Sequence, residues 1–141
     1  MIVYGKADFI ADASIRIFDG AILEIGEGFF SNANVSMDVN KHIKIGKNAL
    51  LGWDVQMIDS DGHDIYIDNK KSNYDRDIVV GDDVWIGSRC SLLKGCVIQN
   101  GCVLGYGSIT SGKHTEEKAI IAGNPAKVIK KDVRWTREKT N

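Results

Sequence analysis

The sequence predicts an all-β solenoid in which short parallel strands stack in coils, and two observations support this prediction. First, aliphatic residues recur at every sixth position, as in Val80, Ile86, Leu92, Ile98 and Leu104. Second, the chain holds 15 glycines and one proline, which suits many tight corners between paired strands. A short fixed period is the sequence signature of stacked coils that share one core.

A second column of small residues follows the first at a distance of four positions. The three cysteines belong to it. Their spacing of six does not suit a zinc site, and an odd number of cysteines in a chain without a secretory signal pattern does not suit a disulfide framework. A buried free thiol behaves as a small hydrophobic side chain, so we expect all three to face the core. The members of the column are Val84, Cys90, Cys96, Cys102 and Ser108.

The same period continues upstream with two breaks. A corner is expected just after each ladder residue, because six of the eleven following residues are glycine, and Asn32 and Asp38 tolerate left-handed backbone. The in-out-in order after each corner is the alternation of a β-strand. Three hexads would close one triangular coil, which leaves room for about five or six coils. The upstream ladder residues are Ile25, Ser31, Met37, Ile45, Leu51 and Met57.

These hexads resemble those of the hexapeptide-repeat acyltransferases, which carry the pattern aliphatic-Gly-x-x-small-x. The resemblance covers roughly residues 20–130 and is strongest in IVVGDDVWIGSRCSLLKGCVIQNGCVLGYGSITSG (78–112) and AIIAGNPAKVIKK (119–131). The most similar subgroup acetylates galactosides, maltose, nodulation factors and cell-surface polysaccharides. The resemblance implies a left-handed parallel β-helix, acetyl-CoA as co-substrate without a metal, and a homotrimer with active sites in its grooves.

We expect one β-helix domain over residues 1–131, with a loop inserted at 63–79 after the second full coil. Residues 132–141 would form a tail that is either a short helix or free. The formal net charge of −1 predicts no broad basic surface for nucleic acid. No apolar run is long enough for a membrane helix, and the N-terminus lacks the pattern of a secretory signal. These features favour a cytoplasmic protein.

The larger break in the repeat places His63 at the start of a polar loop. Acetyl transfer from a thioester to a hydroxyl needs a base, and histidine suits that role because its ordinary pKa lies near 6.5. The resemblance implies that His63 is this general base, whereas the residues alone also allow an ordinary loop histidine. We expect His42 and His114 to be solvated. The three histidines lack the clustering of the metal-binding carbonic anhydrases that share the fold.

Trp85 occupies an outward position on its strand, and we expect Phe30, Leu50 and Val103 to stack with it. An exposed apolar column of this kind usually marks an interface. The resemblance implies that Trp85 lies near the catalytic histidine, although interface packing alone would also explain it. The resemblance further places Asn32 near the acetyl group, where its amide would stabilise an oxyanion. Alternatively, Asn32 fills a corner that asparagine tolerates.

For coenzyme A, the resemblance implies that Ser88 and Tyr106, one coil apart, border the pantetheine arm and that Ser111 follows in the same groove. Lys127 and Lys130 would meet the nucleotide phosphates, since lysine serves as a point charge for phosphate. A solvated basic face is the other interpretation of these two lysines.

The leading hypothesis is an acetyl-CoA-dependent O-acetyltransferase that moves an acetyl group directly to a saccharide hydroxyl. N-acetylation of an amino-sugar nucleotide is an alternative, because the same base and groove would serve. A non-catalytic β-helix scaffold is the third possibility, but it gives no reason for a histidine at the break in the repeat.

Overall fold

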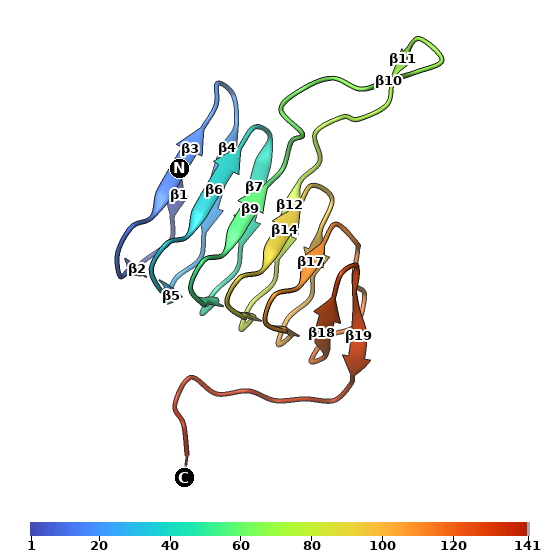
Figure 1. Cartoon of the computed structure of the whole chain (residues 1–141). Helices are drawn as coiled ribbons and strands as arrows, with labels where there is room; N and C mark the ends of the chain where they lie inside the picture. The colour runs from blue at the N-terminus through green and yellow to red at the C-terminus, as the bar shows by residue number, and fades with distance from the viewer. Residues whose placement is uncertain (141) are drawn as a thin grey trace.

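The computed structural model describes residues 1–140, and in it the chain winds into a triangular prism of stacked strands (Figure 1). Strands on each face pair in parallel with strands one coil away. Face 1 holds β1 (Ile2–Val3), β4 (Ile22–Ile25), β7 (His42–Ile45), β12 (Ile78–Val80) and β15 (Val97–Ile98). Face 3 holds β3 (Ser14–Ile17), β6 (Ser36–Val39), β9 (Gln56–Ile58), β14 (Ser91–Leu93) and β17 (Ile109–Thr110).

Face 2 is the longest of the three sheets. It consists of β2 (Ala7–Phe9), β5 (Phe29–Ser31), β8 (Leu50–Leu51), β13 (Trp85–Ile86), β16 (Val103–Leu104), β18 (Ile120–Gly123) and β19 (Ala126–Lys130). Its last strand, β19, turns back antiparallel to β18 and ends the regular coil. The three edges of the prism are called here corner 1–2, corner 2–3 and corner 3–1, after the faces that they join.

The interior of the prism is filled by the two predicted ladders, so their inward orientation is confirmed. Each member of both ladders is at most 1% exposed, including Cys90, Cys96 and Cys102. Stacking places equivalent side chains of successive coils in contact, which gives one continuous apolar core rather than separate clusters.

Glycine follows many ladder residues for a reason that differs from the predicted one. A Cβ added at Gly26 would lie 2.5 Å from the carbonyl carbon of Gly46, and one added at Gly46 would lie 2.6 Å from that of Gly81. These glycines therefore permit close stacking of coils. The left-handed residues come two positions later, as at Asn48 with φ 57° and Asp83 with φ 54°, so the predicted left-handed position was wrong.

Residues 2–17 form an additional first coil that the hexad count omits. Strands β1, β2 and β3 pair with β4, β5 and β6, which aligns Val3, Phe9 and Ile15 with the next coil. The inserted loop therefore follows the third coil and not the second. The chain leaves β9 after Ile58 and re-enters the coil at Ile78, so the insertion is residues 59–77 rather than 63–79.

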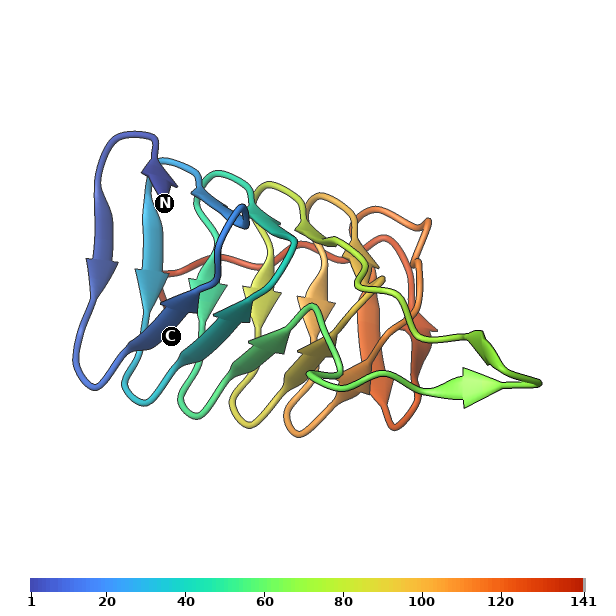
Figure 2. The same ribbon diagram turned by 90° about the horizontal axis from the view of Figure 1, so that it is seen from above.

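The middle of the insertion forms a small antiparallel hairpin that stands away from the prism (Figure 2). Its strands are β10 (Tyr66–Ile67) and β11 (Lys70–Lys71). No helix within residues 1–140 is long and apolar enough to cross a membrane.

The C-terminal tail is neither helical nor free over residues 132–140. It runs extended along the prism, back toward the N-terminal coils (Figure 1). The amide of Val133 donates to the carbonyl of Lys118 at 2.8 Å, and the indole N–H of Trp135 donates to the carbonyl of Asp83 at 2.7 Å. These bonds hold the tail against corner 1–2.

Candidate functional site

A cavity of about 780 Å³ lies between the outer surface of face 2 and the C-terminal tail. Four residues that the sequence predicted for catalysis or cofactor binding line it, namely Asn32, Trp85, Ser88 and Tyr106. Asn32, Ser88 and Tyr106 lie at corner 2–3, just after β5, β13 and β16. Cavities of this volume are typical of ligand sites.

Three members of the predicted outward column, Leu50, Trp85 and Val103, form the apolar wall of this cavity. Phe30, Leu50, Trp85 and Val103 are direct neighbours in the parallel register of face 2, as expected. Trp85 is 40% exposed, and its ring centroid lies 6.0 Å from that of Trp135 on the tail. The column is therefore partly covered by the chain itself.

Asn32 lies half-buried at the rim of the cavity, and its amide is held by the coil. Its Nδ2 donates to the carbonyl of Leu51 at 3.2 Å, which uses one of the two amide hydrogens. The left-handed residue of this corner is Asn34, with φ 63°. The steric explanation that the sequence offered for an asparagine at position 32 is thus wrong.

The corner beside the cavity carries backbone amides that the coil leaves unused. The amides of Gly87 and Gly105 continue the ladder, donating to Leu104 and Ile121 at 2.8 Å each. The next amides along the chain, those of Ser88 and Tyr106, have no acceptor within residues 1–140. Two unpaired N–H groups one coil apart are suited to the carbonyl oxygens of an extended ligand.

His63 lies on the inserted loop at corner 3–1, and hydrogen bonds hold its backbone in place. The amide Nδ2 of Asn73 donates to the carbonyl of His63 at 2.7 Å and to the carboxylate of Asp61 at 2.8 Å. The Oδ1 of Asn73 accepts from the amide of Ile65 at 2.6 Å. Lys94, on the coil, pairs with Asp61 and, together with Asn73, holds the pKa of that carboxyl below its usual range.

The foot of the loop is fixed by Asp59, a residue to which the sequence analysis assigned no role. Its side chain is fully buried and accepts backbone N–H bonds from Asn40, Lys41 and His42 at 2.7, 2.9 and 2.8 Å. Charge-assisted bonds of this kind are stronger than neutral ones. The sequence does carry a signal for this contact. The repeat is two residues too long between Met37 and Ile45, and residues 40–42 lie in this smaller break.

The other two histidines are less solvated than predicted. His42 on face 1 is half-buried, with Nε2 2.6 Å from a carboxylate oxygen of Glu24 and Nδ1 3.5 Å from Asp77. The bond from His42 holds the pKa of Glu24 below its usual range. His114 is also half-buried and bonds Thr110 at 2.8 Å, and burial lowers its pKa.

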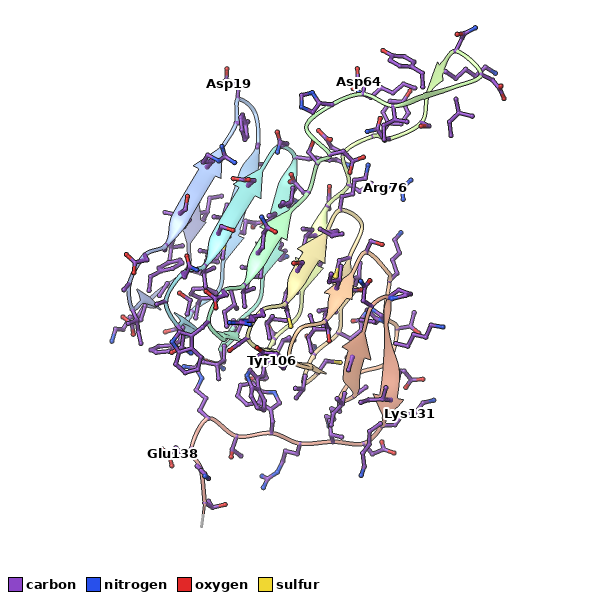
Figure 3. The ribbon with its side chains drawn as sticks, in the orientation of Figure 1. Asp19, Asp64, Arg76, Tyr106, Lys131 and Glu138 are labelled. Carbon is purple, nitrogen blue, oxygen red and sulfur yellow. The ribbon has the colours of Figure 1, made fainter. Side chains whose placement is uncertain are left out.

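The single groove predicted for Ser88, Tyr106 and Ser111 does not exist within one chain. Ser111 follows β17 at corner 3–1, the corner that carries His63, whereas Ser88 and Tyr106 lie at corner 2–3. Figure 3 shows Asp64, the neighbour of His63, and Tyr106 at opposite edges of the prism. Lys127 and Lys130 are exposed on β19 and do not line the cavity.

Comparison with known proteins explains the repeat. The profile of the family described as "Bacterial transferase hexapeptide (six repeats)" matches residues 77–112. This chain is a hexapeptide-repeat protein. The structure extends the same repeat well beyond the matched segment, from β1 to β18.

Two curated relatives are sugar O-acetyltransferases. The hexapeptide-repeat chain is 37% identical over 134 residues to a polysialic acid O-acetyltransferase of Escherichia coli O1:K1 / APEC, covering 94% of this chain and 42% of that protein. It is 31% identical to the galactoside O-acetyltransferase of Escherichia coli K12, covering 79% and 55%. The chain thus spans less than two thirds of the length of either relative.

Solved structures show the same fold. The polySia-specific acetyltransferase NeuO superimposes with a TM-score of 0.79 at 26% identity, covering 99% of this hexapeptide-repeat chain and 70% of that chain. A galactoside acetyltransferase in complex with coenzyme A gives a TM-score of 0.64 at 26% identity, covering 87% and 65%. The left-handed parallel β-helix is therefore confirmed as the fold.

Proposed function

We propose that this protein is an acetyl-CoA-dependent O-acetyltransferase that acts on a saccharide hydroxyl. The observation that carries the proposal is the cavity on face 2, which gathers Asn32, Trp85, Ser88 and Tyr106 from three coils. The names of the relatives support both halves of the reaction. Two are sugar O-acetyltransferases, and one structural neighbour was solved with coenzyme A.

Each residue has a definite part in the proposed reaction. His63 takes the proton of the acceptor hydroxyl as its oxygen attacks the thioester carbonyl, and it returns that proton to the departing thiolate of coenzyme A. In the proposed reaction, the second hydrogen of the Asn32 amide bonds the oxyanion of the tetrahedral intermediate. The unpaired amides of Ser88 and Tyr106 hold the pantetheine arm, and Lys127 and Lys130 attract the nucleotide phosphates.

This assignment requires two copies of the chain at each site. His63 and Ser111 lie at corner 3–1, whereas the cavity lies on face 2 and corner 2–3, so no single prism brings them together. A homotrimer in which corner 3–1 of one copy faces the cavity of the next would complete three identical sites. A closed ring of head-to-tail contacts of this kind is an ordinary symmetric assembly.

The trimer can be tested at Trp85, which is 40% exposed in the isolated chain. We expect Trp85→Asp to weaken the assembly and lower activity together, because a carboxylate would replace an apolar contact between copies. Light scattering at micromolar concentration measures the assembly directly. A monomeric wild type, or a Trp85→Asp trimer of unchanged stability, would contradict the two-copy site.

The activity itself is tested by following release of free thiol from acetyl-CoA. We expect slow release without acceptor and a marked increase with a suitable oligosaccharide, with sialic acid polymers, galactosides and maltose as the first panel. Amino-sugar nucleotides form a second panel, and mass spectrometry distinguishes an ester from an amide product. Acceleration only by amines would replace the proposal with N-acetylation, and binding of coenzyme A without turnover on any acceptor would favour a scaffold.

A further inference from the structure

The C-terminal tail is built into the cavity on face 2. Six successive residues, 135–140, line it opposite the apolar column. The alternation of half-buried Val133 and Trp135 with exposed Arg134 and Thr136 is that of a strand laid along a surface. The tail therefore contributes one long side of this cavity.

The tail is anchored to carbonyl groups at corner 1–2 of four coils. Val133 bonds Lys118, Trp135 bonds Asp83, and the guanidinium of Arg137 donates to the carbonyls of Gly28 and Ala49. Because the anchors span the stack from its C-terminal end to the second coil, the tail runs parallel to the line of corner amides at Ser88 and Tyr106. A slot between two parallel walls suits an extended ligand.

Trp135 is the side chain that closes this slot. Its indole N–H is bound to the carbonyl of Asp83, which fixes the ring, and its face is inclined at 46° to that of Trp85. Aromatic pairs with centroids 4.5–7 Å apart attract one another beyond their burial. Two indoles thus meet at the apolar side of the cavity, while Arg137, Glu138 and Lys139 together give its tail side a net positive charge.

We propose that residues 135–140 are the second wall of the coenzyme A groove, and that Trp135 packs against the pantetheine arm of the bound coenzyme. This inference rests on the proposed function, because it takes the ligand from it. The pantetheine arm is a thin chain with apolar segments between two amides. It fits a slot with indoles on one side and unpaired backbone N–H groups on the other.

The opposite arrangement is a tail that fills the groove and must leave before the coenzyme enters. The two arrangements predict opposite effects of the ligand on the tail. A wall residue is protected when coenzyme A binds, whereas a displaced tail becomes more accessible. The rate of trypsin cleavage measures this accessibility, because Arg134, Arg137 and Lys139 are cleavage sites within the tail.

The test measures coenzyme A binding by calorimetry in the full-length protein. We expect Trp135→Ala to raise the Kd about tenfold and Trp135→Phe, which keeps an aromatic ring, to raise it no more than about threefold. Arg134→Ala is the matched control, because Arg134 precedes the wall segment on the same tail and lines only an adjoining cavity of about 660 Å³ at corner 1–2, which shares Trp135 and Arg137 with the first. Its affinity is expected to match that of the wild type.

Trypsin cleavage within residues 134–139, followed by mass spectrometry, completes the test. Slower cleavage with saturating coenzyme A supports the wall, and faster cleavage overturns it. Equal affinity in the wild type and Trp135→Ala also overturns this inference while leaving the proposed function in place. If the wild type binds no coenzyme A at all, the proposed function fails and this inference fails with it.

Discussion

Replacing His63 with alanine is expected to lower turnover by a factor on the order of 10²–10⁴, the contribution typical of a general base. The affinity for coenzyme A should stay nearly unchanged, because His63 lies at corner 3–1 and does not line the cavity on face 2. Steady-state rates with an identified acceptor, together with calorimetric binding of coenzyme A, measure the two quantities separately.

His42→Gln is the matched control for this experiment. His42 is a half-buried histidine on face 1 whose ring pairs with Glu24, and it is not part of the proposed reaction. Its variant should keep near-normal turnover if the protein is folded. A His63→Ala enzyme within about threefold of the wild-type rate would remove His63 from the mechanism.

Replacing Cys96 with aspartate is expected to prevent folding. Cys96 is fully buried at the centre of the three-cysteine column, and a carboxylate there would have no ionic partner, because its surroundings are the apolar core and the hydroxyl of Thr110. Cys96→Ala removes only a small volume and should cost about 1 kcal/mol of stability. Urea unfolding followed by circular dichroism measures both variants. A stably folded Cys96→Asp protein would contradict the inward orientation.

The same burial has consequences for pH and for mechanism. It raises the pKa of Cys96 from 9.0 to about 12, so the folded protein holds this thiol proton more tightly than the unfolded chain does. The contribution of this pKa shift to the free energy of unfolding is complete below about pH 9 and is lost as pH rises toward 12. A neutral, enclosed thiol cannot serve as a covalent acetyl carrier, so trapping of an acetyl group on Cys96 would refute direct transfer.

The repeat could be predicted from sequence because every coil must fill its share of the core, which requires an apolar or small side chain at each inward position. The first coil was missed for a specific reason: Val3, Phe9 and Ile15 keep the six-residue period, but Tyr4, Ile10 and Arg16 follow them where later coils often have glycine. The ladder was the reliable signal and glycine was not.

The candidate site was predicted in part because position within a hexad determines the face and corner of each residue. Counting in hexads correctly placed Trp85 in the outward column and Ser88 and Tyr106 one coil apart. It also implies that Ser111, five residues after Tyr106, lies at a different corner. The course of the tail was not predictable, because it depends on single bonds such as that from Trp135 to Asp83 rather than on a period.

Asp59 makes the loop and the coil beneath it a single unit for protein engineering. Its carboxylate accepts hydrogen bonds from three backbone amides in the turn at residues 40–42. This turn lies where the repeat is two residues longer than one hexad requires. A graft of residues 59–77 onto another solenoid of this type would therefore leave a buried negative charge without its three donors. The transferable segment begins at Asn40, and a designer who moves the hairpin must move the longer turn with it.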